Sequence, residues 1–488
     1  MTDALLQHPL FPVVNPKSLA FFGASNRFSA MGTNQLDSVL SLGFEGTIYP
    51  IHPKEDRVLG LKAYANVMDL PEVPDLAVMV LPTTIVPETL EQCGRKGIKR
   101  AVIVSGGFKE VGGQGPDLEK KLKEIAGRYG IRFLGPNCLG VINPYHKFNM
   151  TFLPFTGKAG FIGLASQSGS FITQMFDYLA GFGLGFSTGL SVGNEADTDL
   201  VDCLEYLALC PHTKVIGLYI ETIRRGRAFI EAARKIVPHK PIVAYYVGGS
   251  ETGKRAGLSH TGALAGPDRL YDGVFGQSGV IRATTMTELF DFCWVLGMSP
   301  LPQGNRIIIQ THSGGPGAVA ADACGRAGLD LPDFSPETLK ILAPFIPHTG
   351  SVNNPVDLTY ARNMDDYFWS IPKTLLAEPK SDGLLIYLMM PDHPIRRVMS
   401  SMGLDEGQIQ AQIDQFVEKS VGYLIKLAET QTKPVIGFSY RSQVDKLIAI
   451  LQQKSFPVLP SPGRAARAMG ALVRYRYFRE KLVQGSSH

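Results

Sequence analysis

Short apolar runs alternate with longer amphipathic segments, such as PDLEKKLKEIAGRYG, through the first third of the chain. Continuous apolar strands alternating with amphipathic helices are typical of a parallel sheet that is covered on both faces. The pattern therefore predicts a doubly wound α/β domain over residues 1–150, with its ligand site at the carboxyl ends of the strands. The expected strands lie in SLAFFGAS, GTIYPIHPK, LAVMVLP, AVIVSGGF and IRFLGPN.

A second α/β block begins near Gly160, where an apolar strand runs into a Ser/Gly-rich turn and then into a helical pattern. A third block follows the Pro-rich joint MSPLPQG and repeats this opening, with THSGGPG in place of ASQSGS. An internal repeat of this kind predicts two flavodoxin-like domains, over residues 151–300 and 301–488. Further strands are expected in GFSTGLSVGN, KVIGLYIE, PIVAYYVGG, DGLLIYLMMP, KPVIGFSY and FPVLPSPG.

Size and charge narrow the class of protein. The chain has 488 residues, more than one hydrophobic core usually serves, which fits three domains. Its formal net charge is only +4 and it has no Lys/Arg block, so we expect no nucleic-acid surface. No run approaches the ~20 apolar residues of a membrane helix, so we expect no membrane partner. The six cysteines include no CxxC pair, which argues against a zinc site and favours reduced thiols in the cytoplasm.

The turn after the first strand is similar to a dinucleotide-binding turn but lacks GxGxxG; it consists of Gly23, Ala24, Ser25, Asn26 and Arg27. The second strand closes on Lys54, where a pocket for a ribose diol would have Asp or Glu. A lysine there can pair with a phosphate, so the pocket suits a nucleotide that carries an extra phosphate. Coenzyme A fits this description, and NADP is the alternative. For Lys54 alone, a solvated surface lysine is the competing interpretation.

A histidine in the loop AGLSHTGALAG is the strongest catalytic candidate. The neighbours of His260 are small, so the imidazole is left uncovered, and the glycines let backbone and ligand approach closely. Glu221 closes the strand KVIGLYIE and should lie at the same carboxyl edge as the start of this loop. If the motif stood alone, the better interpretation of His260 would be a loop histidine whose hydrogen bonds are satisfied and which has no catalytic role.

Two strand-to-helix turns offer anion sites. Backbone N–H groups and the positive helix end would meet at SQSGS and again at THSGGPG, which suits a phosphate. An ordinary Ser N-cap explains the first turn equally simply. His312, inside the second turn, is a rival nucleophile, but it lies within an anion-binding turn and not on a separate loop that could approach one.

The motifs SHTGALAG, SQSGS, GPNCLG and YIE together resemble the nucleoside-diphosphate-forming acyl-CoA synthetases. The resemblance is to the α subunit of the ADP-forming acetate–CoA ligase type, within the succinyl-CoA synthetase superfamily, and runs from about Pro16 to the end. It implies an N-terminal Rossmann-like CoA-binding domain followed by two flavodoxin-like ligase domains.

The resemblance also implies roles for individual residues. His260 would be phosphorylated transiently, and Glu221 would hydrogen-bond it. The phosphate-binding residues would be Ser168, Gly169 and Ser170 from one domain and Gly314, Gly315 and Gly317 from the other. Coenzyme A would lie along Gly23, Ala24, Ser25, Asn26, Arg27, Lys54, Leu81, Pro82, Ser105, Gly106, Asn137 and Cys138. For Cys138, a small packing residue is the preferred alternative.

The implied reaction interconverts acyl-CoA, ADP and phosphate with a carboxylic acid, CoA and ATP, through an acyl phosphate and phosphohistidine. The nucleotide and its Mg²⁺ would be held by an ATP-grasp β subunit in a hetero-oligomer, and we expect no metal site in this chain. Two other readings of the residues stay open: an NADP-dependent oxidoreductase, and a CoA-binding regulatory protein without catalysis. The sequence does not identify the acyl group.

Overall fold

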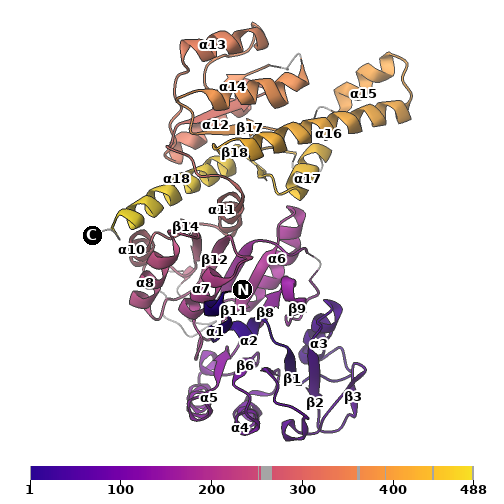
Figure 1. The fold of residues 1–488 in the computed structure, drawn as a ribbon, viewed down its shortest axis with the longest axis vertical. Helices are drawn as coiled ribbons and strands as arrows, with labels where there is room; N and C mark the ends of the chain where they lie inside the picture. The colour runs from indigo at the N-terminus through magenta and orange to yellow at the C-terminus, as the bar shows by residue number, and fades with distance from the viewer. Residues whose placement is uncertain are drawn as a thin grey trace. The chain divides into compact units, whose positions relative to one another are not determined.

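The computed structural model describes residues 2–155, 157–250, 252–253, 266–359, 363–390, 392–441 and 445–485 (Figure 1). The chain divides into two compact units. The first unit consists of residues 1–180, 184–289 and 482–488, and the second of residues 181–183 and 290–481. The loop that carries His260 lies outside the described residues. No described helix is both long and apolar enough to cross a lipid bilayer.

The first sheet contains five parallel strands in the order β2-β1-β5-β6-β7. Counted within the domain this order is 2-1-3-4-5, one of the two common doubly wound arrangements, and its switch point lies between β1 and β5. The doubly wound prediction is confirmed, because each predicted apolar run contains one of these strands. Their bounds are β1 (Ser18–Phe22), β2 (Thr47–Ile51), β5 (Leu76–Met79), β6 (Arg100–Ile103) and β7 (Arg132–Leu134).

Helices on this sheet begin and end where local sequence signals place them. Proline stands in the first turn of both α4 (Val86–Lys96) and α5 (Gly115–Tyr129), where its missing N–H is not needed. Both helices end at a glycine in the left-handed conformation, Gly97 and Gly130. Leu90 of α4 and Leu122 of α5 are buried in the core between these helices and the sheet. The unit also contains α1 (Asp3–Gln7), α2 (Phe11–Val14), α3 (Met31–Ser41) and the hairpin β3 (Arg57–Val58) and β4 (Leu61–Lys62).

The second sheet belongs to the same unit and has the order β14-β13-β12-β10-β11-β8-β9. Five of its strands are parallel and again follow the order 2-1-3-4-5: β10 (Ile162–Ser166), β11 (Phe186–Ser191), β12 (Val215–Ile220), β13 (Ile242–Tyr246) and β14 (Ile281–Ala283). The strand β8 (Val141–Asn143) pairs antiparallel with β11, and β9 (Phe148–Asn149) pairs antiparallel with β8. Its helices are α6 (Gly169–Gly181), α7 (Leu200–Leu209), α8 (Gly226–Ile236) and α10 (Asp268–Ser278).

The predicted boundary at residue 150 therefore falls after two strands of the second sheet. The segment 141–149 was not expected to contain strands because Pro144 and two asparagines interrupt its short apolar runs. The antiparallel pairing of β8 with β11 through Ile142 and Gly189 depends on a partner more than 40 residues away.

The third sheet lies in the second unit and is also parallel, in the order β16-β15-β17-β18-β19. Its order is once more 2-1-3-4-5, so the predicted repeat of two flavodoxin-like folds is confirmed. Its core gathers Leu384 and Ile386 from the sheet and Val417 and Leu424 from α16. The strands are β15 (Ile307–Thr311), β16 (Val356–Asp357), β17 (Gly383–Tyr387), β18 (Val435–Phe438) and β19 (Val458–Leu459).

Helices of the third block include the 25-residue α16 (Glu406–Thr430), which begins with a capping box between Asp405 and Gln408. The others are α12 (Gly314–Arg326), α13 (Pro336–Leu342), α14 (Ile371–Ala377), α15 (Asp392–Ser401), α17 (Lys446–Gln453) and α18 (Pro462–Gly485). The helix α11 (Met286–Met298) leads into this block.

Candidate functional site

The turn after β1 is built on glycine. Gly23 has φ +95°, and a Cβ on it would lie 1.9 Å from the carbonyl oxygen of Val80, at the end of β5. Gly32, in α3, fits equally closely, because a Cβ there would lie 2.3 Å from the Gly23 oxygen. The strand ends and the helix thus approach as in a dinucleotide-binding turn, although the glycine spacing differs from GxGxxG.

The side chains of this predicted coenzyme turn have different surroundings. Ser25 is held by Thr33, whose hydroxyl accepts from the Ser25 N–H and donates to the Ser25 carbonyl oxygen, each at 3.0 Å. Asn26 is engaged by the hairpin: it donates to the Arg57 carbonyl and accepts from the Leu59 N–H, each at 2.9 Å. Ala24 is buried, whereas Arg27 and Lys54 are exposed. Asn26 therefore fastens the β3–β4 hairpin to the turn, and the two exposed cations remain for an anionic ligand.

The ends of β5, β6 and β7 are joined by short polar contacts. The hydroxyl of Ser105 accepts from the Leu81 N–H at 3.0 Å, and the Asn137 N–H donates to the Ser105 carbonyl at 2.9 Å. Gly106 lies against Asn137, whose Oδ1 would be 3.1 Å from a Cβ on that glycine. The structure thus brings these four predicted residues together, with exposed Pro82 following Leu81.

Cys138 is turned into the protein. It is 3% exposed, and its S–H donates to the Ile103 carbonyl oxygen at 3.4 Å. Burial raises the pKa of its thiol to about 12. These surroundings favour the packing role over contact with the coenzyme.

The phosphate-binding turn predicted at residues 168–170 opens α6, at the carboxyl end of β10. The Ser166 hydroxyl donates to the Ser168 carbonyl oxygen at 2.7 Å, and the hydroxyls of Ser168 and Ser170 lie 3.5 Å apart. A Cβ on Gly169 would meet the Leu139 side chain at 2.7 Å, so glycine is needed for the helix to start here. Ser170 is exposed, which leaves the helix N-terminus open to a ligand.

Gln167 connects this turn to the end of β12. Its side-chain oxygen accepts from the Glu221 N–H at 2.5 Å and the Thr222 N–H at 2.9 Å, and its amide nitrogen donates to the Thr222 carbonyl at 2.9 Å. Because Gln167 is itself 7% exposed, these bonds are shielded from water. The backbone of Glu221 is therefore held next to the predicted phosphate-binding turn, as the strand pattern predicts, while its contact with His260 stays a prediction.

The carboxyl edges of the first two sheets meet. The loop after β11 contacts the segment after β7: the Asn194 N–H donates to the Pro136 carbonyl at 2.8 Å. Gly193 has φ +55°, and a Cβ on it would lie 2.3 Å from the Asn137 carbonyl oxygen. The Asn194 amide also donates to Glu110 at 2.6 Å. The predicted coenzyme residues therefore lie beside the edge that carries the phosphate-binding turn.

Glu195 follows in the same loop. It is 5% exposed and has φ +50°, a left-handed conformation that only the surrounding structure can hold in a glutamate. Its Oε1 accepts from the Leu200 N–H at 2.9 Å. Burial raises the pKa of this carboxyl to about 8, although the bond from the Leu200 N–H favours the ionised form.

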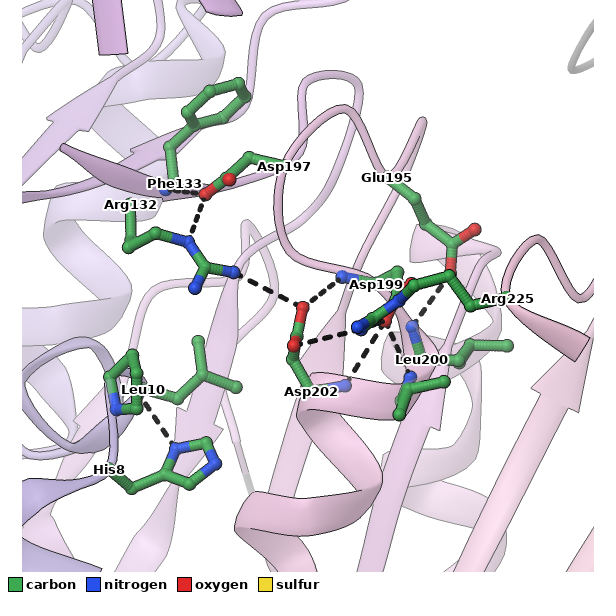
Figure 2. Close-up of polar contacts among 12 residues, drawn as sticks. His8, Leu10, Arg132, Phe133, Glu195, Asp197, Asp199, Leu200, Asp202 and Arg225 are labelled. Atoms are coloured by element: carbon green, nitrogen blue, oxygen red, sulfur yellow. Dashed lines mark hydrogen bonds and ion pairs between the residues drawn. The ribbon is translucent and has the colours of Figure 1, made fainter. Parts of the chain in front are cut away.

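An ion-pair network anchors the loop between Glu195 and α7 (Figure 2). Arg225 makes two 2.5 Å bonds to Asp199, the N-cap of α7, and a third at 3.0 Å to Asp202. Arg132, from β7, reaches Asp197 at 2.8 Å and Asp202 at 3.3 Å. Arg132 from β7 and Arg225 from the N-cap of α8 thus fix one acidic segment, so the network stabilises the junction of the sheet edges.

The second predicted phosphate turn lies in the second unit, at the start of α12. Gly314 and Gly315 are exposed and Gly317 is buried. A Cβ on Gly315 would meet nothing within 4 Å. The Asp357 carboxylate lies near this turn, 3.4 Å from the place of a Cβ on Gly314, and its charge opposes a bound anion.

His312 is packed beside this second turn. Its ring stacks on Tyr367 with centroids 3.7 Å apart, and burial lowers the pKa of the imidazole to about 4. Its Nε2 has no hydrogen-bond partner among the described residues. These surroundings describe a neutral packing histidine.

Three family models match the chain in the order of its sheets. They are a CoA binding domain over residues 17–144, a succinyl-CoA ligase like flavodoxin domain over 159–296 and a ligase-CoA domain over 307–391. The α subunit of acetate–CoA ligase (ADP-forming) II from Pyrococcus furiosus is 37% identical over 94% of this chain and 96% of its own length. The chain belongs to the ADP-forming acyl-CoA synthetase family. The corresponding α subunit of isoenzyme I from the same organism is 36% identical over 96% of this chain and 98% of its own length.

A solved member of the family has the same fold. The dinucleotide-forming acetyl-coenzyme A synthetase 1 of Ca. Korarchaeum cryptofilum, in complex with phosphate and ADP, matches with a TM-score of 0.85 and 34% identity. The match covers 98% of each chain. The predicted fold class, an N-terminal CoA-binding domain followed by two flavodoxin-like ligase domains, is confirmed. The family models also favour coenzyme A over NADP at the first sheet.

Sequence reasoning missed Asn194, which joins the two sheet edges, and Gln167, which connects the turn before α6 to the end of β12. For Asn194 the local signal is the run VGNEAD directly after an apolar strand, because a glycine and polar residues at a strand's carboxyl end are typical of a ligand-side loop.

Proposed function

We propose that this chain is the α subunit of an ADP-forming acyl-CoA synthetase. It would interconvert acyl-CoA, phosphate and ADP with a carboxylic acid, CoA and ATP. Two relatives named as α subunits match it over nearly their whole length, which supports this assignment. The structural observation that carries it is the Gln167 side chain, which joins Glu221 to the phosphate-binding turn.

In the first step an oxygen of phosphate attacks the thioester carbonyl carbon of acyl-CoA. The carbon–sulfur bond breaks, and the sulfur leaves as the CoA thiol with the proton that phosphate gives up. Phosphate would be held by Ser168, Gly169 and Ser170, where backbone N–H groups and the helix end favour negative charge. CoA would lie along the first sheet edge, whose contact with the β11 loop supports this placement.

In the second step a nitrogen of His260 attacks the phosphorus of the acyl phosphate, and the carboxylate leaves as the P–O bond breaks. Glu221 would accept a hydrogen bond from the imidazole and stabilise its positive charge. The phosphoryl group then passes from His260 to ADP, with the α12 turn at Gly314, Gly315 and Gly317 as the second phosphate site. Such transfers depend on position and charge stabilisation, which helix ends and a carboxylate supply.

We assign nucleotide binding to a partner subunit with an ATP-grasp fold, which would also hold Mg²⁺ with the nucleotide. The relatives are named subunit alpha, which supports a partner. The two chains would form a hetero-oligomer.

Phosphorylation of His260 tests the proposal. The chain and its partner subunit are incubated with Mg²⁺ and ATP labelled in the γ-phosphate, and protein-bound label is measured after acid or base treatment. We expect acid-labile, base-stable label on the wild type and none on His260→Asn. Label that survives in His260→Asn, or no label with any partner, contradicts the proposed function.

The acyl group is identified by a second assay. The complex is supplied with CoA, ATP and one carboxylic acid at a time, from acetate through branched, aryl and hydroxy acids, and CoA thiol consumption is followed. The preferred acid should show the highest kcat/KM.

A further inference from the structure

We propose that Asn194 is a positioning residue for coenzyme A, which turns the side-chain oxygen of Asn137 toward the ligand at Gly106. The inference rests on the proposed function and adds a residue to its coenzyme site. Asn194 follows β11 in the second sheet, yet its side chain contacts the loops of the first sheet. It is 5% exposed, so these contacts are shielded from water.

Both ends of the Asn194 amide have partners. The side-chain nitrogen donates to Oε2 of Glu110 at 2.6 Å and to Oε2 of Glu119 at 3.2 Å. The side-chain oxygen accepts from Nδ2 of Asn137 at 3.4 Å. The backbone carbonyl of Asn194 accepts from the Lys109 ammonium at 2.8 Å. Rotation of this amide would break several bonds in a buried place, so its orientation is fixed.

The Glu110 carboxylate decides which way the neighbouring amides point. Its Oε1 accepts from the N–H groups of Gly107 and Phe108, at 2.5 and 3.2 Å, so Glu110 is a hydrogen-bond acceptor on both sides. Only the nitrogen of Asn194 can face such a carboxylate, which leaves the Asn194 oxygen toward Asn137. The Asn137 amide then offers its nitrogen to Asn194 and turns its own oxygen the other way.

This oxygen of Asn137 faces Gly106, which is exposed. A Cβ on Gly106 would lie 3.1 Å from Oδ1 of Asn137 and 3.3 Å from Oε1 of Glu110. The missing side chain thus leaves room for a ligand beside two acceptor oxygens. The phosphates of coenzyme A would be repelled by Glu110, whereas the neutral arm that carries the thiol has amide N–H groups that Asn137 can accept from.

The place of the Asn194 nitrogen does not suit a negative charge. Among the described residues, the charged groups that face it are Glu110, Glu119 and Lys109, with Lys123 acting on Glu119 from further away. Burial raises the pKa of Glu119, and the hydrogen bond from Asn194 opposes this shift. Asn194→Asp adds a third acid group here and removes the donor that the other two share.

Calorimetry on the full chain measures the Kd for CoA. Asn194→Ala should raise this Kd about tenfold, because the hydrogen bond from the ligand to Asn137 is no longer aligned. Asn194→Asp should raise it about 100-fold at pH 8, since repulsion between carboxylates displaces Glu110 as well. At pH 5.5 the loss in Asn194→Asp should shrink to about tenfold or less relative to the wild type at that pH, because a protonated carboxyl is again a donor. Asn194→Ala should show no such recovery.

A second substitution tests the orientation of the amides directly. Glu110→Gln alone places an amide nitrogen against the nitrogen of Asn194, so CoA affinity should fall. In the double variant Asn194→Asp with Glu110→Gln, the new amide can donate to the new carboxylate while its oxygen still accepts from the Gly107 N–H. The double variant should therefore bind CoA at least about fivefold more tightly than Asn194→Asp at pH 8.

The complex with its partner subunit is then assayed for acyl-CoA synthesis. Asn194→Ala should raise KM for CoA about tenfold, while kcat and KM for ATP stay within about twofold. Arg132→Met is the matched control, because Arg132 fastens the same loop at Asp197 and Asp202, further along the chain (Figure 2). Both substitutions should lower the urea midpoint, but Arg132→Met should leave KM for CoA within about twofold.

Equal rises of KM for CoA in Asn194→Ala and Arg132→Met overturn the inference, because Asn194 is then only a fastener between the sheets. An unchanged Kd in Asn194→Ala, or the absence of both the recovery at low pH and the rescue by Glu110→Gln, also overturns it. The Kd is measured without turnover. A chain that binds CoA as expected, in a complex that makes no acyl-CoA from any acid, therefore contradicts the proposed reaction and leaves the role of Asn194 intact.

Discussion

Replacing Gly23 by alanine tests whether the turn after β1 is as closely packed as the structure describes. Gly23 has φ +95°, and an added Cβ would lie 1.9 Å from the Val80 oxygen and 2.7 Å from its carbonyl carbon. No rotation of a side chain relieves this overlap, because the opposing atoms belong to the backbone of Val80, directly after β5. Either the turn or the strand end must move.

The magnitude follows from two contributions. A left-handed conformation in alanine costs about 1–2 kcal/mol. Moving Val80 disturbs its N–H bond to Phe22, at 3.1 Å, and the adjoining bond from Leu81 to Ser105, at 3.0 Å, each worth about 1 kcal/mol. We therefore expect Gly23→Ala to lower the free energy of unfolding by about 3–4 kcal/mol, a large share of a typical domain's stability.

The assay is urea denaturation, with CoA affinity measured by calorimetry on the folded variant. Gly60→Ala is the control, because Gly60 also has a positive φ, +83°, but a Cβ there would meet nothing within 4 Å. It should lose only the backbone contribution, about 1–2 kcal/mol, and keep its CoA affinity. CoA binding by Gly23→Ala should weaken at least about tenfold, which corresponds to 1.4 kcal/mol. Equal destabilisation by both substitutions would refute the packing argument.

Three further substitutions follow from single contacts. Arg225→Ala removes both bonds to buried Asp199 and should destabilise the chain by about 1–2 kcal/mol after allowance for the exposure of Arg225. Burial acts to raise the pKa of Asp199, but the bonds from Arg225 outweigh burial and lower the pKa. The stabilisation by this ion pair is therefore complete above about pH 4 and is lost as the pH falls further. The acid denaturation curves of wild type and Arg225→Ala should converge at low pH. Asp357→Asn removes the negative charge near the α12 turn and should tighten inorganic phosphate binding about two- to fivefold in calorimetry at low salt; unchanged affinity would exclude that turn as an anion site. Gly127→Ala, at an exposed site in α5 with open space around it, should raise the urea midpoint through about 0.5–1 kcal/mol of added stability.

The fold was predictable where a strand is buried on both faces. Runs such as SLAFF in β1 and IGLAS in β10 are wholly buried, and a continuous apolar run bounded by glycine or serine is a local signal that needs no partner. The strands β3, β4, β8 and β9 are only two or three residues long. Their pairing depends on neighbours elsewhere in the chain, so the sequence pattern does not reveal them.

The same distinction applies to the site. Glu221 and the turn at Ser168 could be placed because each directly follows an apolar strand, and parallel strands share a carboxyl edge. The roles of Gln167 and Asn26 could not, since their partners lie 54 and 33 residues away in sequence. Which polar side chain reaches which backbone group is decided by packing between segments, so the hairpin contacts of Asn26 do not follow from the sequence, and its place at the coenzyme stays a prediction.

The segment 137–139 links the predicted coenzyme edge of the first sheet to the predicted phosphate-binding turn of the second sheet. Asn137 contacts Gly106 at the edge assigned to coenzyme A, and Leu139, two residues later, lies against Gly169 at the start of α6. Two successive residues span at most about 7 Å of extended chain, so the predicted coenzyme edge and the predicted phosphate-binding turn lie close together. Acyl transfer from sulfur to phosphate would then need no rearrangement of this unit. Under the proposed function, delivery of the phosphoryl group to a nucleotide on another subunit would be the step that needs a separate carrier, and a histidine on a loop of small residues would suit that task.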